Sequence, residues 1–138
     1  MRKGVVAFAL LLGGLLWLRS RGSDAALASG SNGRLGRAEM QVARAGELAM
    51  AIGVVSQAQD SRLFEVAWTV THPNWQRRGD TLLREIAPQG TEQYGVIQPT
   101  PAIAAGERLQ VDLYLFSRSL CGMPPVQDDA QRVTLTAP

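Results

Sequence analysis

The feature that most constrains the fold of this chain is the strict alternation of apolar and polar side chains in three stretches. In LFEVAWTVT, residues 63–71, the apolar positions share one face: Phe64, Val66, Trp68 and Val70. In RLQVDLYLF, residues 108–116, the same pattern recurs: Leu109, Val111, Leu113 and Leu115. RVTLT, residues 132–136, repeats it with Val133 and Leu135. A period of two over such lengths predicts half-buried β-strands.

Two more strand-sized segments lie between these stretches. TLLREIA (81–87) and EQYGVI (92–97) are separated by the turn sequence PQG. The next segment, PTPAIAAGE (99–107), contains two prolines, so we expect an edge or a loop there rather than a central strand. It ends in a turn that leads into the longest predicted strand.

Residues 37–59 fit two patterns. Leu48, Met50, Ile52 and Val54 alternate with small residues, as in a strand, but the alanines of this segment favour a helix. Gly46 and Gly53 weaken a helix. We favour two strands, and a helix remains the alternative.

The N-terminus carries fifteen consecutive apolar or glycine residues, at positions 4–18. As a helix this run spans about 22 Å, less than the hydrocarbon core of roughly 30 Å, which by itself suggests a signal peptide. Trp17 at its border, and cations that can extend towards the head groups, favour an anchor instead. We predict a transmembrane anchor over residues 1–19, with these membrane contacts: Lys3, Val5, Phe8, Leu11, Leu15, Trp17 and Arg19. The alternative is cleavage after Ala28.

A glycine- and serine-rich segment, residues 20–36, follows the predicted anchor. Such a composition is typical of a flexible tether. Residues 37–138 then form one small domain. Its six or seven short strands predict an all-β, antiparallel β-sandwich. The arrangement resembles an immunoglobulin-like domain, with Trp68 near the place of that family's core tryptophan, although the family's cysteine pair is missing.

Charge is unevenly distributed between the two parts. The net charge is +4 before residue 37 and −2 from Arg37 onward. The domain therefore lacks the basic stripe that nucleic-acid binding requires, so no nucleic-acid partner is expected. The positive arm is suited to anionic membrane lipid. The small bias of positive charge places the N-terminus in the cytoplasm and the domain outside.

Few residues suggest chemistry. The single cysteine, Cys121, excludes an intrachain disulfide, and we expect it to be buried or inert. The single histidine, His72, is interpreted as a hydrogen-bonded structural residue. Asp128 and Asp129 suggest a solvated turn before the last strand. No metal site, cofactor or catalytic constellation is predicted.

Three features suggest a partner surface. NWQRRGD (74–80), expected as a loop, carries Trp75 with Arg77 and Arg78, a combination typical of binding hot spots. Trp75 could instead cap the end of the sandwich, which we favour, and the RGD tripeptide is interpreted as ordinary turn chemistry. Tyr114 and Phe116 lie on the outer face of the longest strand. They are either covered by another segment of the chain or available to a partner.

We therefore predict a non-enzymatic, single-pass membrane protein with a small extracytoplasmic domain. Its role would be structural or recognitive, as a minor component of an envelope or of a membrane-containing virion. Its partners would be membrane lipid and other protein subunits, and self-association is left open. The alternative is a secreted or periplasmic binding module released after Ala28.

Overall fold

The computed structural model describes residues 17–20, 32–43, 45–122 and 124–138, and these are all-β. Within these residues there are nine strands: β1 (Trp17–Ser20), β2 (Gly33–Ala43), β3 (Glu47–Ser56), β4 (Arg62–His72), β5 (Trp75–Asp80), β6 (Arg84–Ile86), β7 (Thr91–Pro99), β8 (Arg108–Ser119) and β9 (Val126–Thr136). All pairings are antiparallel. The all-β prediction is confirmed for this part of the chain.

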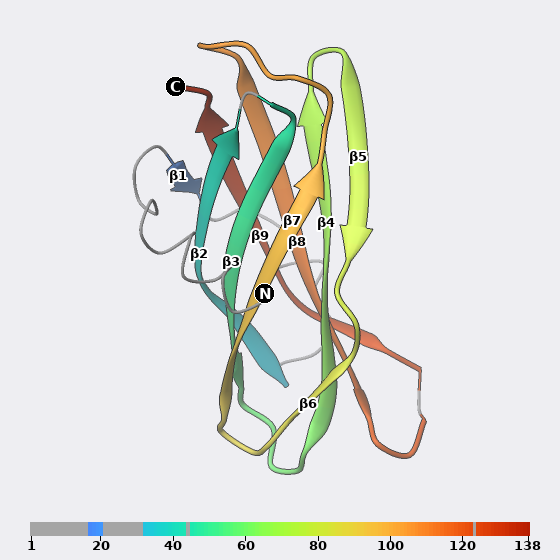
Figure 1. The fold of residues 1–138 in the computed structure, drawn as a ribbon. Helices are drawn as coiled ribbons and strands as arrows, with labels where there is room; N and C mark the ends of the chain where they lie inside the picture. The colour runs from blue at the N-terminus through green and yellow to red at the C-terminus, as the bar shows by residue number, and fades with distance from the viewer. Residues whose placement is uncertain (1–16, 21–31, 44, 123) are drawn as a thin grey trace.

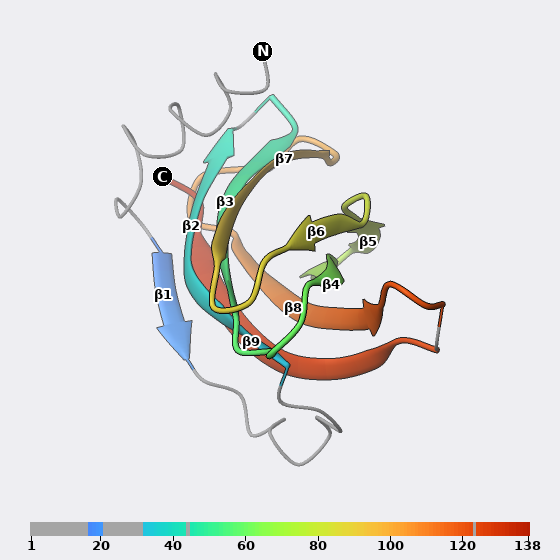
Figure 2. The same cartoon turned by 90° about the horizontal axis from the view of Figure 1, so that it is seen from below.

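The strands form two sheets that face each other across the core (Figures 1 and 2). The large sheet has the order β1-β9-β8-β4-β5, with β6 also paired to β4. The small sheet has the order β2-β3-β7. Residues of both sheets contribute to one buried hydrophobic cluster, so the two layers share a core.

The alternating stretches form the central strands of the large sheet. All four apolar positions of residues 63–71 are buried on β4, and all four of residues 108–116 are buried on β8. Val133 and Leu135 on β9 are also buried. The predicted inner face is therefore confirmed.

Residues 37–59 contain parts of two strands, as favoured, and not a helix. Gly46 in the β2–β3 connection has a φ of 102°, and a Cβ there would lie 2.4 Å from the backbone oxygen of Thr100. Only glycine accommodates that conformation and that approach. Strand β2 begins at Gly33, inside the segment expected as a tether, and Gly33, Arg34 and Leu35 pair with β3.

Two segments expected to be loop or turn are strands. Residues 75–80 form β5, because the backbone turns tightly after His72 and pairs back along β4. The RGD tripeptide therefore lies in a strand. Asp128 and Asp129 lie within β9, which begins at Val126.

The predicted anchor falls mostly outside the described residues. Within it, the backbone of β1 pairs with β9, with Trp17 opposite Leu135. In the described part of the chain, no helix has the length and apolar character needed to cross a bilayer.

Candidate interaction surfaces

The predicted partner residues do not form one surface. Arg77 lies opposite Val70 and Trp75 opposite His72, so both side chains are on the inner side of the large sheet. Arg78 lies opposite Thr69 and therefore points outward. Tyr114 and Phe116 also lie on this outer face, opposite Ala67 and Glu65 respectively. Strand alternation thus separates the two neighbouring arginines.

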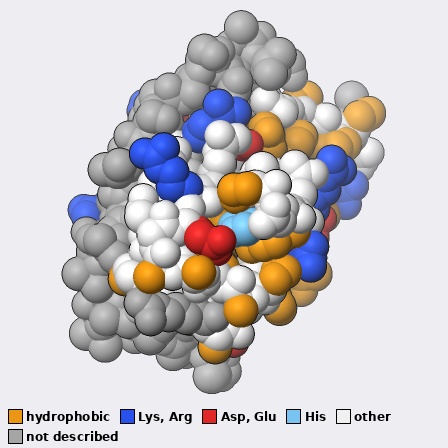
Figure 3. Space-filling view, turned by 90° about the horizontal axis from the view of Figure 1, so that it is seen from above, with side chains coloured by type: hydrophobic (Ala, Val, Ile, Leu, Met, Phe, Trp, Pro, Cys, Tyr) orange, Lys and Arg blue, Asp and Glu red, His pale blue; other side chains and the backbone are white. Residues whose placement is uncertain are grey.

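Trp75 covers one end of the sandwich, as favoured from the sequence. Its ring stacks on His72 with the centroids 4.8 Å apart, and the Arg77 guanidinium lies 5.6 Å from the Trp75 ring. Trp75 is half-buried and packs against the hydrophobic cluster. Figure 3 views the molecule at this end, with the histidine ring in pale blue between apolar side chains.

His72 is a buried, hydrogen-bonded residue. The backbone N–H of Asn74 donates to Nδ1 at 3.1 Å, which assigns the proton to Nε2. Nε2 then donates to Glu107 Oε1 at 3.0 Å. The pKa of Glu107 is lowered by the Ala104 N–H bond and, next, by this histidine. Both ring nitrogens are thus engaged by the protein itself.

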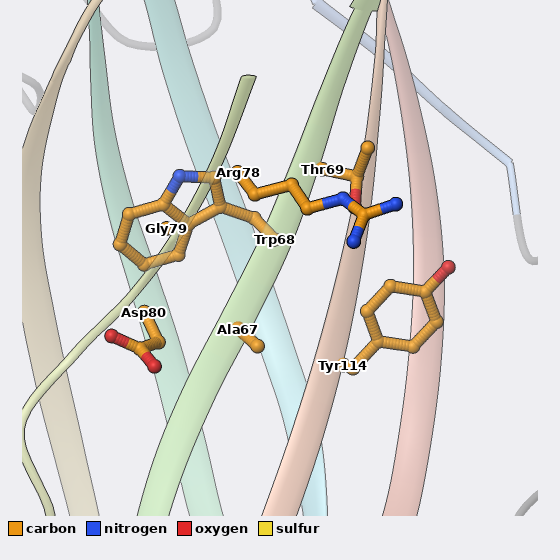
Figure 4. A pocket seen from close by; sticks show the side chains of 7 residues that line it. All are labelled: Ala67, Trp68, Thr69, Arg78, Gly79, Asp80 and Tyr114. Carbon is orange, nitrogen blue, oxygen red and sulfur yellow. The ribbon is translucent and has the colours of Figure 1, made fainter. Parts of the chain in front are cut away.

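A shallow hollow lies on the outer face of the large sheet, with a volume of about 340 Å³. It is lined by Ala67, Trp68, Thr69, Arg78, Gly79, Asp80 and Tyr114. Figure 4 shows the Arg78 side chain extended across β4 in the direction of Tyr114. Ala67 and Thr69 form the floor of the hollow between Arg78 and Tyr114, and because their side chains are small the hollow stays open.

The charges on this face are mixed. Burial raises the pKa of Glu65, and the neighbouring Asp80 carboxylate adds to that shift, while Arg118 opposes it. Arg132 Nε donates to Asp112 at 2.7 Å, so that carboxylate is already paired. Arg78 and Asp80 are both exposed at the rim of the hollow. The face can therefore meet a partner that carries charges of both signs.

A second cavity, of about 490 Å³, opens between the β5–β6 side of the large sheet and β7. Sequence reasoning missed it. At its floor the indole N–H of Trp68 donates to Gln98 Oε1 at 2.9 Å. Its apolar rim includes Leu82, 89% exposed, and Ile97, 41% exposed. In the sequence, the only indication of this cavity is the low charge of EQYGVI. That local pattern does not show which side of the strand lacks a neighbour, and so it does not place the cavity.

Aromatic contacts stabilise the other end of this cleft. Tyr94 is buried, and its hydroxyl donates to the backbone oxygen of Phe64 at 3.2 Å. Burial raises the pKa of Tyr94 to about 12. The Arg84 guanidinium lies 4.5 Å from the Tyr94 ring. The phenol is therefore a neutral structural donor.

Two carboxylates connect the beginning of the small sheet to the large sheet by hydrogen bonds. Asp129 Oδ2 accepts from the Leu35 N–H at 2.8 Å. Asp128, which is buried, accepts from the Asn32 N–H at 3.2 Å and from the Ser117 hydroxyl. We call this set, Asn32, Leu35, Ser117, Asp128 and Asp129, the carboxylate clasp. It joins the start of the small sheet to β9 of the large one.

Cys121 was expected to be buried or inert, and it is exposed rather than buried. It lies in the β8–β9 connection, next to Leu120, which is 54% exposed. The end of the β8–β9 hairpin extends beyond the hydrophobic core, so the Cys121 side chain has no core to pack into. Among the described residues, no group of three or more His, Cys, Asp or Glu could hold a metal ion.

Comparisons with known proteins give structural likeness only. No family model and no curated protein matches the chain. A structural genomics target, SoR45, aligns over 78% of this chain and 88% of its own, with 15% identity and a TM-score of 0.53. The putative ApaA protein from Bordetella pertussis aligns over 78% of this chain and 97% of its own, with 14% identity and a TM-score of 0.52. At these identities the likeness shows a common fold and carries no information on activity.

Proposed function

We propose that this chain is a non-enzymatic interaction protein, anchored in a membrane by its N-terminal apolar run. Its domain, an immunoglobulin-like β-sandwich, would bind another subunit of an envelope or virion assembly. The observation that carries the proposal is the outer face of the large sheet. There the hollow between Arg78 and Tyr114 combines an aromatic wall, a low floor and exposed charges.

The immunoglobulin-like assignment is supported by the two facing antiparallel sheets and by Trp68. This side chain is 5% exposed and lies on β4, with β8 and β5 as neighbours. A tryptophan on an inner strand of one sheet, packed between two sheets, is typical of such domains. A fold of this kind does not specify a function, so the function must be argued from the surface.

The composition of the outer face is typical of a binding hot spot. Tyr and Arg are enriched at positions that carry most of the binding energy, and small neighbours allow a partner side chain to enter. Tyr114 is half-buried, so its side chain is already partly immobilised in the free protein. It therefore loses less conformational entropy when a partner binds. Arg78 and Asp80 at the rim supply charges that would set the orientation of a partner.

Charge reversal at Arg78 is expected to abolish co-purification of the partner. In mild detergent extracts of the native membrane, Arg78→Glu and Tyr114→Ala should each reduce recovery of the partner by at least about tenfold, since hot-spot truncations cost about 2 kcal/mol or more. Gln76→Ala, an exposed change on the same face of β5, is the matched control and should retain the partner. Retention of the partner by both hollow variants, with thermal unfolding unchanged, would show that this face is not the interface.

The anchored form is expected to resist extraction with alkaline carbonate. The full chain should remain in the membrane pellet, whereas a chain beginning at Ser29 should be released, because it lacks the apolar run. Release of the intact full chain would contradict the anchor. Detection of Ser29 as the mature N-terminal residue by mass spectrometry would instead support the secreted or periplasmic alternative.

A further inference from the structure

The predicted anchor leads directly into the large sheet. The apolar run ends at residue 18, and strand β1 already begins at Trp17. The glycine- and serine-rich segment therefore follows the first strand and does not separate the run from the sheet. Strand β1 is antiparallel to β9, with Trp17 opposite Leu135 near the end of β9. Residues 1–16, which lie outside the described residues, are thus attached at the end of the sandwich where β9 finishes.

The register of the large sheet brings the β4–β5 turn to this same end. Leu135, the partner of Trp17, also pairs with Leu109 at the start of β8. The β8–β4 pairs bring His72 level with Leu109, and His72 pairs with Trp75 at the start of β5. Four strand spacings, about 19 Å, separate β1 from β5. Figure 1 shows the β2–β3, β4–β5 and β7–β8 connections together at this end. We call it the Trp75 end, and it is formed by residues 45–46, 73–75, 100–107 and 136–138.

The β8–β9 connection lies at the opposite end of the sandwich. Ser119, where β8 finishes, is ten positions from Leu109, about 33 Å along a strand. Cys121 follows Ser119 and is exposed. Figure 1 shows this hairpin end extending away from the Trp75 end. The native thiol therefore marks a surface far from the point where the apolar run is attached.

The Trp75 end has side chains suited to a layer of lipid head groups. Trp75 is half-buried, and the Arg77 guanidinium lies 5.6 Å from its ring. Tryptophan, with an apolar ring and a polar N–H, is enriched where proteins meet the membrane–water interface. Residues 100–106 beside it carry no charge, and Ala102, Ala104 and Ala105 are exposed. This surface can therefore lie against lipid without burying an unpaired charge.

The charged groups near this end are of both signs. Arg77 and Arg108 are exposed and can meet lipid phosphates. Glu47 is exposed at the start of β3. Glu107 accepts from a backbone N–H at 2.9 Å and from His72 at 3.0 Å, so protein donors already engage its charge. The Trp75 end is therefore suited to hydrated head groups and not to the hydrocarbon core.

We propose that the Trp75 end rests on the surface of the membrane that holds the N-terminal run, with Trp75 in the head-group layer. This inference rests on the proposed membrane anchor. A domain held by a flexible tether can turn freely, whereas β1, paired into the sheet, fixes the direction in which the chain leaves the domain. The strands of the large sheet then point away from the bilayer. The outer face, with Arg78 and Tyr114, stays open to a protein partner.

Quenching by nitroxide-bearing lipids tests which end lies at the membrane. The full chain is reconstituted in vesicles of phosphatidylcholine and phosphatidylglycerol, with a nitroxide near the head group of a fraction of the lipid. A fluorophore is attached to Cys121 of the native chain, or to residue 105 of a chain with Ala105→Cys and Cys121→Ser. Ala105 is exposed at the Trp75 end. We expect several-fold stronger quenching at residue 105 than at residue 121, because this short-range quenching does not reach the far end of the domain.

A second variant guards against a change at residue 105 that disturbs its turn. Asn74→Cys, in the same Cys121→Ser chain, replaces an exposed side chain in the β4–β5 turn and keeps the backbone N–H that donates to His72. A fluorophore there should be quenched about as strongly as one at residue 105. Equal quenching at residues 74, 105 and 121, or the strongest quenching at residue 121, would overturn the proposal.

Flotation of the vesicles separates this result from the proposed function. A chain that floats with the vesicles but shows equal quenching at all three positions is anchored, and only the contact of the Trp75 end is then wrong. A chain that does not float with the vesicles contradicts the anchor itself and, with it, this proposal.

Discussion

Replacing Trp68 by alanine is expected to lower the free energy of unfolding by about 3–5 kcal/mol, the usual cost of truncating a large buried aromatic residue. Trp68 is 5% exposed, lies on β4 between β8 and β5, and forms the floor of the cleft. Its loss removes apolar burial and leaves a cavity that neighbouring strands cannot fill. Urea unfolding of the full chain in mild detergent, followed by far-ultraviolet circular dichroism, measures the change.

The contact between Trp68 and Gly79 gives this prediction a control. A Cβ at Gly79 would lie 2.7 Å from Trp68 Cζ2, so Gly79→Ala should destabilise the wild-type protein. In the Trp68→Ala chain the indole is absent, so the same change should cost much less. A double-mutant cycle measures this coupling. Additive effects of the two substitutions would show that the indole does not set the spacing between β4 and β5.

The sequence predicted the strands where the alternation was regular and the buried face was apolar. Residues 63–71 and 108–116 are apolar on one face, so period two was visible without tertiary information. In the segment 37–59, alternation correctly favoured strands although alanine favours helix, because tertiary pairing overrides weak propensity. Local patterns of this kind reveal a buried face but not the neighbours of that face.

Strand β5 was missed because its inward positions are not conventionally apolar. Trp75, Arg77 and Gly79 point inward, and each inward position depends on a partner elsewhere: Arg77 lies over Trp75, and Gly79 is required by Trp68. An Arg-Gly-Asp sequence has the composition of a turn. Residue 79 is glycine because the indole of Trp68, on the adjacent strand, occupies the space that a side chain there would need.

The candidate surfaces were partly predictable for the same reason. Tyr114 and Phe116 were placed correctly on the outer face, because alternation along β8 determines it. The separation of Arg77 from Arg78 required the registration of β5 on β4. Among the described strands, β7 lies at the end of the small sheet, and this place depends on sheet order, which links residues far apart in the sequence and leaves no local signature.

Asp128 illustrates the same limit and carries the second large prediction. In the β8–β9 ladder, Leu115 lies opposite Asp129 and Phe116 opposite Gln127, so Asp128 is the extra residue of a β-bulge. The bulge redirects its carboxylate to the buried Ser117 hydroxyl and the Asn32 N–H. Asp128→Ala should lower the free energy of unfolding by about 2–4 kcal/mol, because it leaves more than one buried or half-buried donor unpaired. Urea unfolding measures this loss.

The clasp offers two controls that separate lost hydrogen bonds from lost volume. Asp128→Asn keeps the shape and an acceptor for Asn32, so it should cost less than Asp128→Ala. Ser117→Ala removes the donor itself. In the Ser117→Ala chain the further change Asp128→Ala should therefore cost less than in the wild type, with a coupling of about 1 kcal/mol or more. Additivity, or a loss below about 0.5 kcal/mol for Asp128→Ala, the level of an ordinary surface substitution, would show that the clasp does not hold the two sheets together.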